Sequence, residues 1–205
     1  MAETGHIDTF ARDNLPPREQ WPEFKFDLPE LQYPERLNCV TEWVDRWVAA
    51  GQGDRPCLIS PAETLTYAQL HERVNRIANV LTRDLGLVPG GRVLLRAPNN
   101  PMMVAAYFAV IKAGGIAVAT MPLLRAKELS YPLAKAQITL ALCDSRLADE
   151  MEKAKTQSPN LKRIVYWGPN SGELQALMEK PGYESFTACD TASDDVCLIA
   201  FTSGT

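Results

Sequence analysis

One apolar stretch in the middle of the chain decides its fold: NPMMVAAYFAVIKAGGIAVAT, residues 100 to 120. Asn100 can cap a helix whose first position is Pro101, where a missing N–H costs nothing. That helix is expected to run to Gly114, and residues 116–120 then form a continuous apolar strand, typical of a parallel sheet covered on both faces. Because Lys112 and the glycines interrupt the apolar run, a buried helix and a buried strand are favoured over a membrane span.

Helical and strand patterns alternate on either side of this stretch. A capping box at Thr66 and Gln69 opens a helix that Gly86 ends, and Pro132 is expected to kink or shorten a helix over 128–136. The other predicted helices cover 146–155 and 173–179, and the predicted strands cover 92–97, 116–120, 138–143, 164–167 and 196–201. This alternation predicts an α/β fold with three layers, in which helices flank a mainly parallel sheet.

The first 40 residues differ from the rest of the chain. They are rich in prolines and aromatic residues, which favour extended backbone over a long helix. We expect residues 1–40 to form an extended strap whose aromatic side chains plug into the body. A helix follows at about 40–50, and residues 41–205 form one α/β subdomain.

Composition excludes several classes of protein. The chain has 46% hydrophobic and 22% charged residues and a net charge of -4, which is globular and argues against a nucleic-acid binder. No apolar leader is visible near the N-terminus. The five cysteines are scattered without a Cys-x-x-Cys pair, as expected for reduced thiols in a cytoplasmic protein without a metal site or a membrane anchor.

The last residues carry the strongest functional signal. An apolar run over 196–201 leads into Thr202, Ser203, Gly204 and Thr205. Hydroxyls and a glycine at this place can wrap backbone N–H groups around an anion, although a plain polar turn is the alternative. Phosphate loops usually continue with a further glycine and a lysine, so the chain is expected to be truncated inside a nucleotide-binding loop.

Other polar residues favour structural roles. His71 is expected to be solvated, and without a Gly-x-Ser-x-Gly motif a Ser-His-Asp hydrolase has little support. Asp194 and Asp195 point to opposite faces of a strand and read as solubilising charges. The paired glycines do not make a Gly-x-Gly-x-x-Gly fingerprint, which argues against a Rossmann dinucleotide site.

Four segments in order resemble the adenylate-forming, AMP-binding superfamily of acyl-CoA synthetases, adenylation domains and luciferases. They are LTYAQL at 65–70, VPGGRV at 88–93 with Gly91 where an aspartate is usual, IKAGGIAV at 111–118 followed by PLLR, and TSGT at 202–205. The resemblance covers roughly residue 40 onward. It implies that this chain is part of the N-terminal domain of such an enzyme.

The resemblance implies a two-step reaction. A carboxylic acid attacks the α-phosphate of Mg²⁺-bound ATP, and coenzyme A then displaces AMP to give a thioester. Thr202, Ser203, Gly204 and Thr205 are the residues that would wrap the phosphates. The catalytic lysine and the acid pocket of the family lie outside this sequence, so no catalytic residue is assigned here and the 205-residue chain is expected to be inactive alone.

The N-terminal strap gives the narrowest resemblance. NLPPREQWP at 14–22 and LQYPERLN at 31–38 look most like 2-aminobenzoate–CoA and benzoate–CoA ligases, with medium-chain acyl-CoA synthetases second. A short non-catalytic module that binds a partner remains the alternative to an enzyme fragment. An open apolar sheet edge is expected to favour self-association of the isolated chain.

Overall fold

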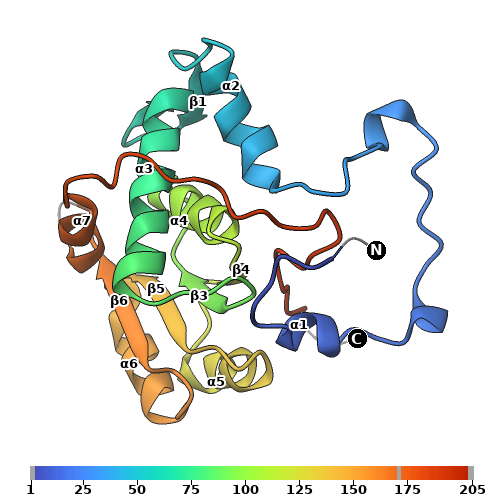
Figure 1. The fold of residues 1–205 in the computed structure, drawn as a ribbon. Coiled ribbons are helices and arrows are strands. Elements are labelled where there is room, and N and C mark those ends of the chain that lie inside the picture. The colour runs from blue at the N-terminus through green and yellow to red at the C-terminus, as the bar shows by residue number, and fades with distance from the viewer. Residues whose placement is uncertain (1–2, 170–171, 203–205) are drawn as a thin grey trace.

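A four-stranded parallel sheet forms the centre of the protein. The computed structural model describes residues 3–169 and 172–202. The strands lie in the order β4-β3-β5-β6 (Figure 1). Their bounds are β3 (Arg92–Arg96), β4 (Ile116–Thr120), β5 (Leu140–Asp144) and β6 (Arg163–Trp167). Each overlaps a strand predicted from the sequence, and all three pairings are parallel, as predicted.

Helices cover both faces of this sheet. One face carries α3 (Tyr67–Asn79), α4 (Pro101–Lys112) and α7 (Glu173–Met178), and the other carries α5 (Ala126–Lys135) and α6 (Ala148–Thr156).

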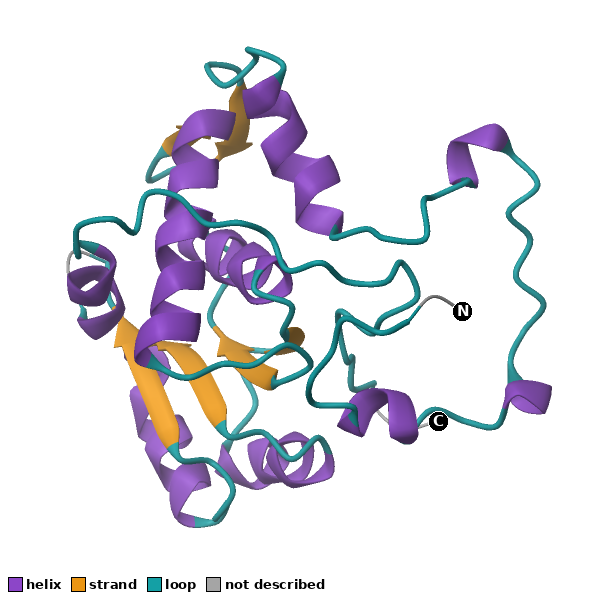
Figure 2. Ribbon diagram, viewed as in Figure 1, coloured by secondary structure: helices purple, strands orange, loops and turns teal. Residues whose placement is uncertain are grey.

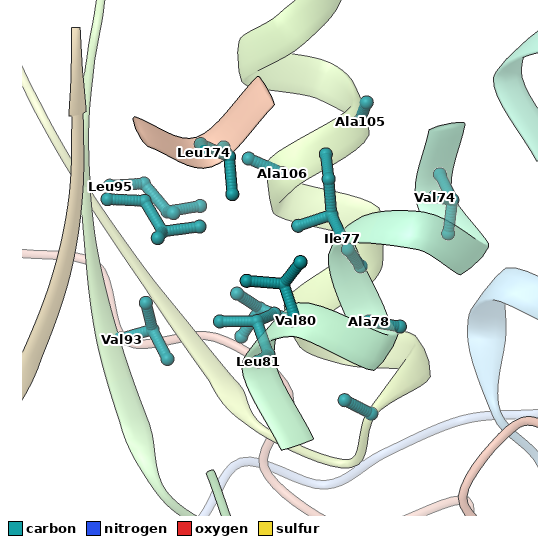
Figure 3. Close-up of a cluster of buried hydrophobic side chains, with 14 of the residues drawn as sticks. Val74, Ile77, Ala78, Val80, Leu81, Val93, Leu95, Ala105, Ala106 and Leu174 are labelled. Carbon is teal, nitrogen blue, oxygen red and sulfur yellow. The ribbon is translucent and has the colours of Figure 1, made fainter. Parts of the chain in front are cut away.

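Alternate residues of β3 supply the two cores, because successive strand side chains point to opposite faces. Val93 and Leu95 pack with α3 and α4, while Leu94 packs with α5 and α6. Figure 3 shows Val93 and Leu95 facing Val80, Leu81 and Ala106. The predicted three-layer α/β fold is confirmed.

Local sequence signals explain the helix starts. The Thr66 side chain accepts from the Gln69 amide and the Gln69 side chain accepts from the Thr66 amide, which completes the predicted capping box. Beyond Asn79 the helix continues as a π-helical turn, Val80–Asp84. The helix predicted at about 40–50 consists of a π-helical turn, Thr41–Asp45, and α2 (Arg46–Ala49).

Pro132 does not shorten its helix. α5 begins at Ala126, before the predicted start at 128, and runs through Pro132 to Lys135. The carbonyl that loses its helical donor belongs to Glu128, which is exposed, so water can satisfy that carbonyl. Pro132 itself is buried and contributes to packing.

Two elements differ from the sequence prediction. A short antiparallel pair, β1 (Pro56–Ile59) and β2 (Thr64–Thr66), precedes α3 and was not predicted (Figure 2).

The predicted strand 196–201 is wrong in extent, because its pairing with β4 is a single parallel bridge between Ala117 and Leu198. Leu198 is 46% exposed at this edge, so little packing holds the segment in a regular ladder. Self-association through the edge stays a prediction.

The N-terminal strap is anchored at its two ends. The Ile7 and Asp8 amides both donate to the Pro89 carbonyl, and Arg36 bridges to Ala192. Between these points the chain forms a wide loop outside the body (Figure 1). Phe24 and Tyr33 are 60% and 58% exposed, so the expectation that such aromatic residues plug into the body is wrong for them. Phe24 instead stacks on Phe26 of the same loop.

Candidate phosphate site at the carboxyl edge of the sheet

The carboxyl ends of the parallel strands meet at one edge of the sheet. The segments after β3, β4 and β5 therefore leave the sheet on the same side. β3 lies in the middle of this arrangement, with β4 on one side and β5 on the other. In open α/β sheets, ligands bind at this edge, where the strand order reverses.

The terminal segment delivers Thr202 to the same edge. The Ala117 amide donates to the Cys197 carbonyl at 3.0 Å, and the Ile199 amide donates to the Ala117 carbonyl at 3.0 Å. The segment therefore runs parallel to β4. From this bridge the segment heads toward the carboxyl end of β4, and Thr202 follows Phe201 in that direction. Thr202 is exposed, whereas the predicted site residues Ser203, Gly204 and Thr205 lie outside the described residues.

The residues that precede Thr202 are held in place by packing against α5. Phe201 meets the Tyr131 ring of α5 edge-on, with ring centroids 5.8 Å apart. Ile199 and Phe201 both pack against the core beneath α5. The residue before the candidate loop is thus held by the body of the protein.

The turn after β4 is held by a buried arginine that the sequence analysis missed. Arg96, at the end of β3, is 1% exposed. Its guanidinium donates to the carbonyl oxygens of Met121 at 3.1 Å, Pro122 at 3.0 Å and Leu124 at 2.6 Å. A planar guanidinium can donate to several carbonyls at once, so Arg96 shapes the turn after β4.

The N-terminus of α4 lies at the same edge but is already capped. The Met103 amide donates to the Asn100 side chain at 2.8 Å, as the sequence predicts.

A large cavity of about 870 Å³ also opens at the carboxyl ends of β5 and β6. Its walls include Glu63, Arg73, Arg76, Asp144 and Arg146, whereas Thr202 does not line it. Its arginines are already engaged: Arg73 forms a two-pronged pair with Glu63, and Arg146 donates to Asp144 at 2.7 Å. Arg76 is paired with Glu72. The cavity is therefore a charge-balanced space rather than a ready phosphate site.

The expectation that His71 is solvated is wrong. It is half-buried, with Nε2 3.5 Å from the Asp45 carboxylate, and burial lowers the pKa of the imidazole. The Lys112 ammonium donates to the same Asp45 carboxylate at 2.8 Å and to the side-chain oxygen of Asn75 at 2.7 Å. Lys112 is fully buried. The lysine of the IKAGGI segment thus joins α4 to α3 and to the turn before α2.

Asp194 and Asp195 have different roles, and the expectation that both are solubilising charges is wrong for Asp195. Its side chain is 2% exposed and accepts from the Thr4 hydroxyl and the amides of Gly5 and Ala192. Arg12 donates to it at 2.7 Å. Burial opposes ionisation, but these donors outweigh it and lower the pKa of Asp195 to about 2. Asp195 therefore clamps the N-terminal strap next to the terminal segment.

This clamp predicts a pH-dependent loss of stability in Asp195→Asn. A carboxyl whose pKa is lower in the folded chain stabilises it above the unfolded pKa, and this contribution disappears as pH falls through the folded value. At pH 7 the substitution is expected to cost about 2 kcal/mol. The difference from the unsubstituted chain should shrink between about pH 4 and pH 2, measured by urea denaturation. Asp194→Asn is the matched control, and an equal loss in both variants would contradict the clamp.

None of the helices in residues 3–169 and 172–202 has the length and apolar character needed to cross a membrane. Over the same residues, His, Cys, Asp and Glu side chains do not gather in threes where they could hold a metal ion.

One known protein family matches most of the chain. The family described as AMP-binding enzyme matches residues 45–205. Benzoate–CoA ligase of Thauera aromatica is 29% identical over 176 residues, which is 86% of this chain and 33% of that protein. A long-chain fatty acid–CoA ligase of Yersinia pestis is 26% identical over 208 residues, covering 87% of this chain and 37% of that protein.

A solved structure shares the fold. The anthranilate CoA ligase AuaEII, in complex with anthranoyl-AMP, aligns with a TM-score of 0.77 at 23% identity, over 84% of this chain and 32% of that one. The chain spans about a third of the length of the curated relatives it matches. Because the family match extends over most of the sequence, the chain belongs to the AMP-binding enzyme family.

Proposed function

We propose that the protein of which this chain forms the N-terminal part is an ATP-dependent acid–CoA ligase. The observation that carries the proposal is the AMP-binding enzyme match over residues 45–205, which includes the TSGT segment at 202–205. In such a ligase a carboxylate attacks the α-phosphate of ATP, and coenzyme A then takes the acyl group from AMP. The chain itself would contribute phosphate binding.

The proposed phosphate loop is Thr202, Ser203, Gly204 and Thr205. Hydroxyls and backbone N–H groups of such a loop are suited to the oxygen atoms of the β- and γ-phosphates. Mg²⁺, when bound with ATP, would neutralise part of the phosphate charge. Arg96 and Phe201 do not touch the nucleotide in this proposal. They hold the two segments between which the loop emerges.

Benzoate and 2-aminobenzoate are the proposed acid substrates. A benzoate–CoA ligase is among the curated relatives, and the AuaEII structure was solved with anthranoyl-AMP, the adenylate of 2-aminobenzoate. A fatty acid is the second candidate, favoured by the long-chain fatty acid–CoA ligase that matches a similar share of the chain. Our sequence-based alternative is a medium-chain acid. A partner-binding module without catalysis is the remaining alternative.

An acid panel separates these candidates. The whole protein would be supplied with ATP, Mg²⁺ and coenzyme A, and AMP release would be measured with benzoate, 2-aminobenzoate, hexanoate, octanoate and palmitate. We expect both aromatic acids to exceed the fatty acids by at least about tenfold in kcat/KM, because a short flat pocket and a deep apolar tunnel select different shapes. Efficient turnover of a fatty acid without turnover of either aromatic acid would contradict the aryl assignment and leave the ligase class intact.

A further inference from the structure

Two of the five cysteines, Cys39 and Cys197, meet at one small cavity although they lie 158 positions apart in the sequence. Each thiol shifts the pKa of the other. Both residues are half-buried, and both line one cavity of about 50 Å³ between the N-terminal strap, the end of α4 and the terminal segment. The other cysteines have different surroundings. Cys57 lies in β1, Cys143 is buried in the sheet, and Cys189 packs against Gly114.

The backbone holds the two thiols in place from both sides. Asn38, next to Cys39, is buried and donates from its side chain to the carbonyls of Ile111 at 2.9 Å and Cys189 at 3.2 Å. Cys197 accepts at its carbonyl from the Ala117 amide of β4. Both anchors lead to the connection between α4 and β4. The thiols therefore meet because of the fold and not because of a chance overlap of loose ends.

The chemistry of the pair favours reaction at Cys39. The Cys197 thiol can donate to a Cys39 thiolate and lowers the pKa of Cys39 to about 6, while Cys39 and burial raise the pKa of Cys197. A thiolate is the reactive form of cysteine, and a second thiol beside it can resolve an oxidised intermediate. His6 and Asp195 also line the cavity. Tyr107 lies nearby: burial raises the pKa of its phenol, and the charges of Cys197 and Cys39 raise it further.

The cavity has room for a small oxidant. Its volume of about 50 Å³ exceeds the roughly 10–15 Å³ that a cavity needs to hold one water molecule. Hydrogen peroxide, with only two heavy atoms, fits such a space. We propose that Cys39 and Cys197 form a redox modification site, in which hydrogen peroxide converts the thiol pair into a reversible disulfide between the strap and the terminal segment.

The steps balance. The Cys39 thiolate attacks one peroxide oxygen, the O–O bond breaks, and hydroxide leaves, giving a sulfenic acid on Cys39. The Cys197 sulfur, after losing its proton, attacks the Cys39 sulfur, the S–O bond breaks, and the oxygen leaves as water. The two sulfurs supply two electrons to one peroxide, which becomes two water molecules once the protons are counted. A thiol reductant reverses the oxidation. This proposal does not depend on the acid–CoA ligase activity.

Peptide mapping of the reduced 205-residue chain after treatment with hydrogen peroxide tests the site. We expect loss of two hydrogen masses and a linked peptide pair that contains Cys39 and Cys197. A bond that closes so long a loop should raise the melting temperature by about 5–10 °C, and dithiothreitol should remove the increase. The Cys57→Ser chain is the matched control and should behave like the unsubstituted chain.

Single variants distinguish the thiol that attacks peroxide from the thiol that resolves the sulfenic acid. Cys197→Ser should stop at a sulfenic acid that dimedone traps on Cys39, and Cys39→Ser should lose peroxide reactivity by roughly tenfold. Mapping of the unsubstituted chain answers the question even if a variant fails to fold. A disulfide that joins other cysteines, or a folded chain that keeps both thiols free at excess peroxide, would overturn the proposal.

Discussion

Replacing Asp45 with alanine is expected to destabilise the chain by about 3 kcal/mol, because the substitution leaves the Lys112 ammonium buried without its counter-charge. The Lys112 side chain is 1% exposed, and its ammonium lies 2.8 Å from the Asp45 carboxylate. Asn75 would remain as a neutral acceptor. A neutral oxygen compensates a buried charge only in part.

Removing the other partner of the ion pair, Lys112, should cost less free energy of unfolding. Lys112→Met removes the ammonium and leaves a carboxylate that is 24% exposed and can take water as a partner. We expect a cost of about 1 kcal/mol. Glu42→Ala is the matched control, since it removes an exposed carboxylate paired with Arg46 and should cost less than about 1 kcal/mol. Urea denaturation gives all three values, and equal losses in Asp45→Ala and Glu42→Ala would contradict a buried ion pair.

The same cluster gives a pH signature. Burial lowers the pKa of Lys112 below its ordinary value of 10.5, although Asp45 opposes the shift. The unfolded chain therefore binds more protons than the folded chain between the folded pKa and 10.5. The free energy of unfolding of the unsubstituted chain should therefore rise with pH through this window, and that of Lys112→Met should lack this rise. Urea denaturation at a series of pH values measures the difference.

Arg96→Met is expected to cost about 3 kcal/mol, because three backbone carbonyls lose their donor at once. Those carbonyls belong to the turn after β4, from Met121 to Leu124. Methionine keeps the apolar stem and ends near the position of Nε, so the change removes the guanidinium with all of its donors and leaves its space empty. Amide hydrogen exchange at Leu124, which donates to Met121, should accelerate beyond the global effect.

Arg163→Met supplies the comparison for Arg96. Arg163 belongs to β6 of the same sheet but is exposed, and it pairs with Glu173 at the surface. Its substitution should change the unfolding free energy by less than about 0.5 kcal/mol. If Arg96→Met unfolds at the same urea concentration as Arg163→Met and leaves exchange at Leu124 unchanged, Arg96 does not organise this turn.

The architecture could be predicted from the sequence because local and global signals agree. The Asn100-Pro101 start of α4, the glycines after it and the apolar run of β4 each specify the same elements that the sheet uses. The extent of the terminal segment could not be predicted in this way. Its apolar composition is that of a strand, but regular pairing depends on neighbours along its whole length, and within the described part of the chain only Ala117 of β4 pairs with it.

The polar groups around the candidate site were harder to predict. Arg96 and Lys112 are charged residues inside apolar runs, which signals burial, but their partners lie far away in the sequence. Asp195 takes its donors from Thr4, Gly5 and Arg12, and no periodicity links these segments. Thr202 could be singled out because the resemblance to a known motif identifies it. The parallel bridge to β4 shows that the segment before Thr202 runs toward the carboxyl end of that strand.

Carboxylate-dependent exchange of labelled pyrophosphate into ATP tests the central proposal most directly, because it reports adenylate formation without coenzyme A. The account predicts exchange by the whole protein only when an acid substrate is present. It predicts at least about a tenfold loss in Thr202→Ala and little change in Thr156→Ala, whose hydroxyl donates only to the Lys153 carbonyl within α6. The isolated 205-residue chain should give no exchange. Exchange by the isolated chain, or none by the whole protein with any acid of the panel, would contradict the account.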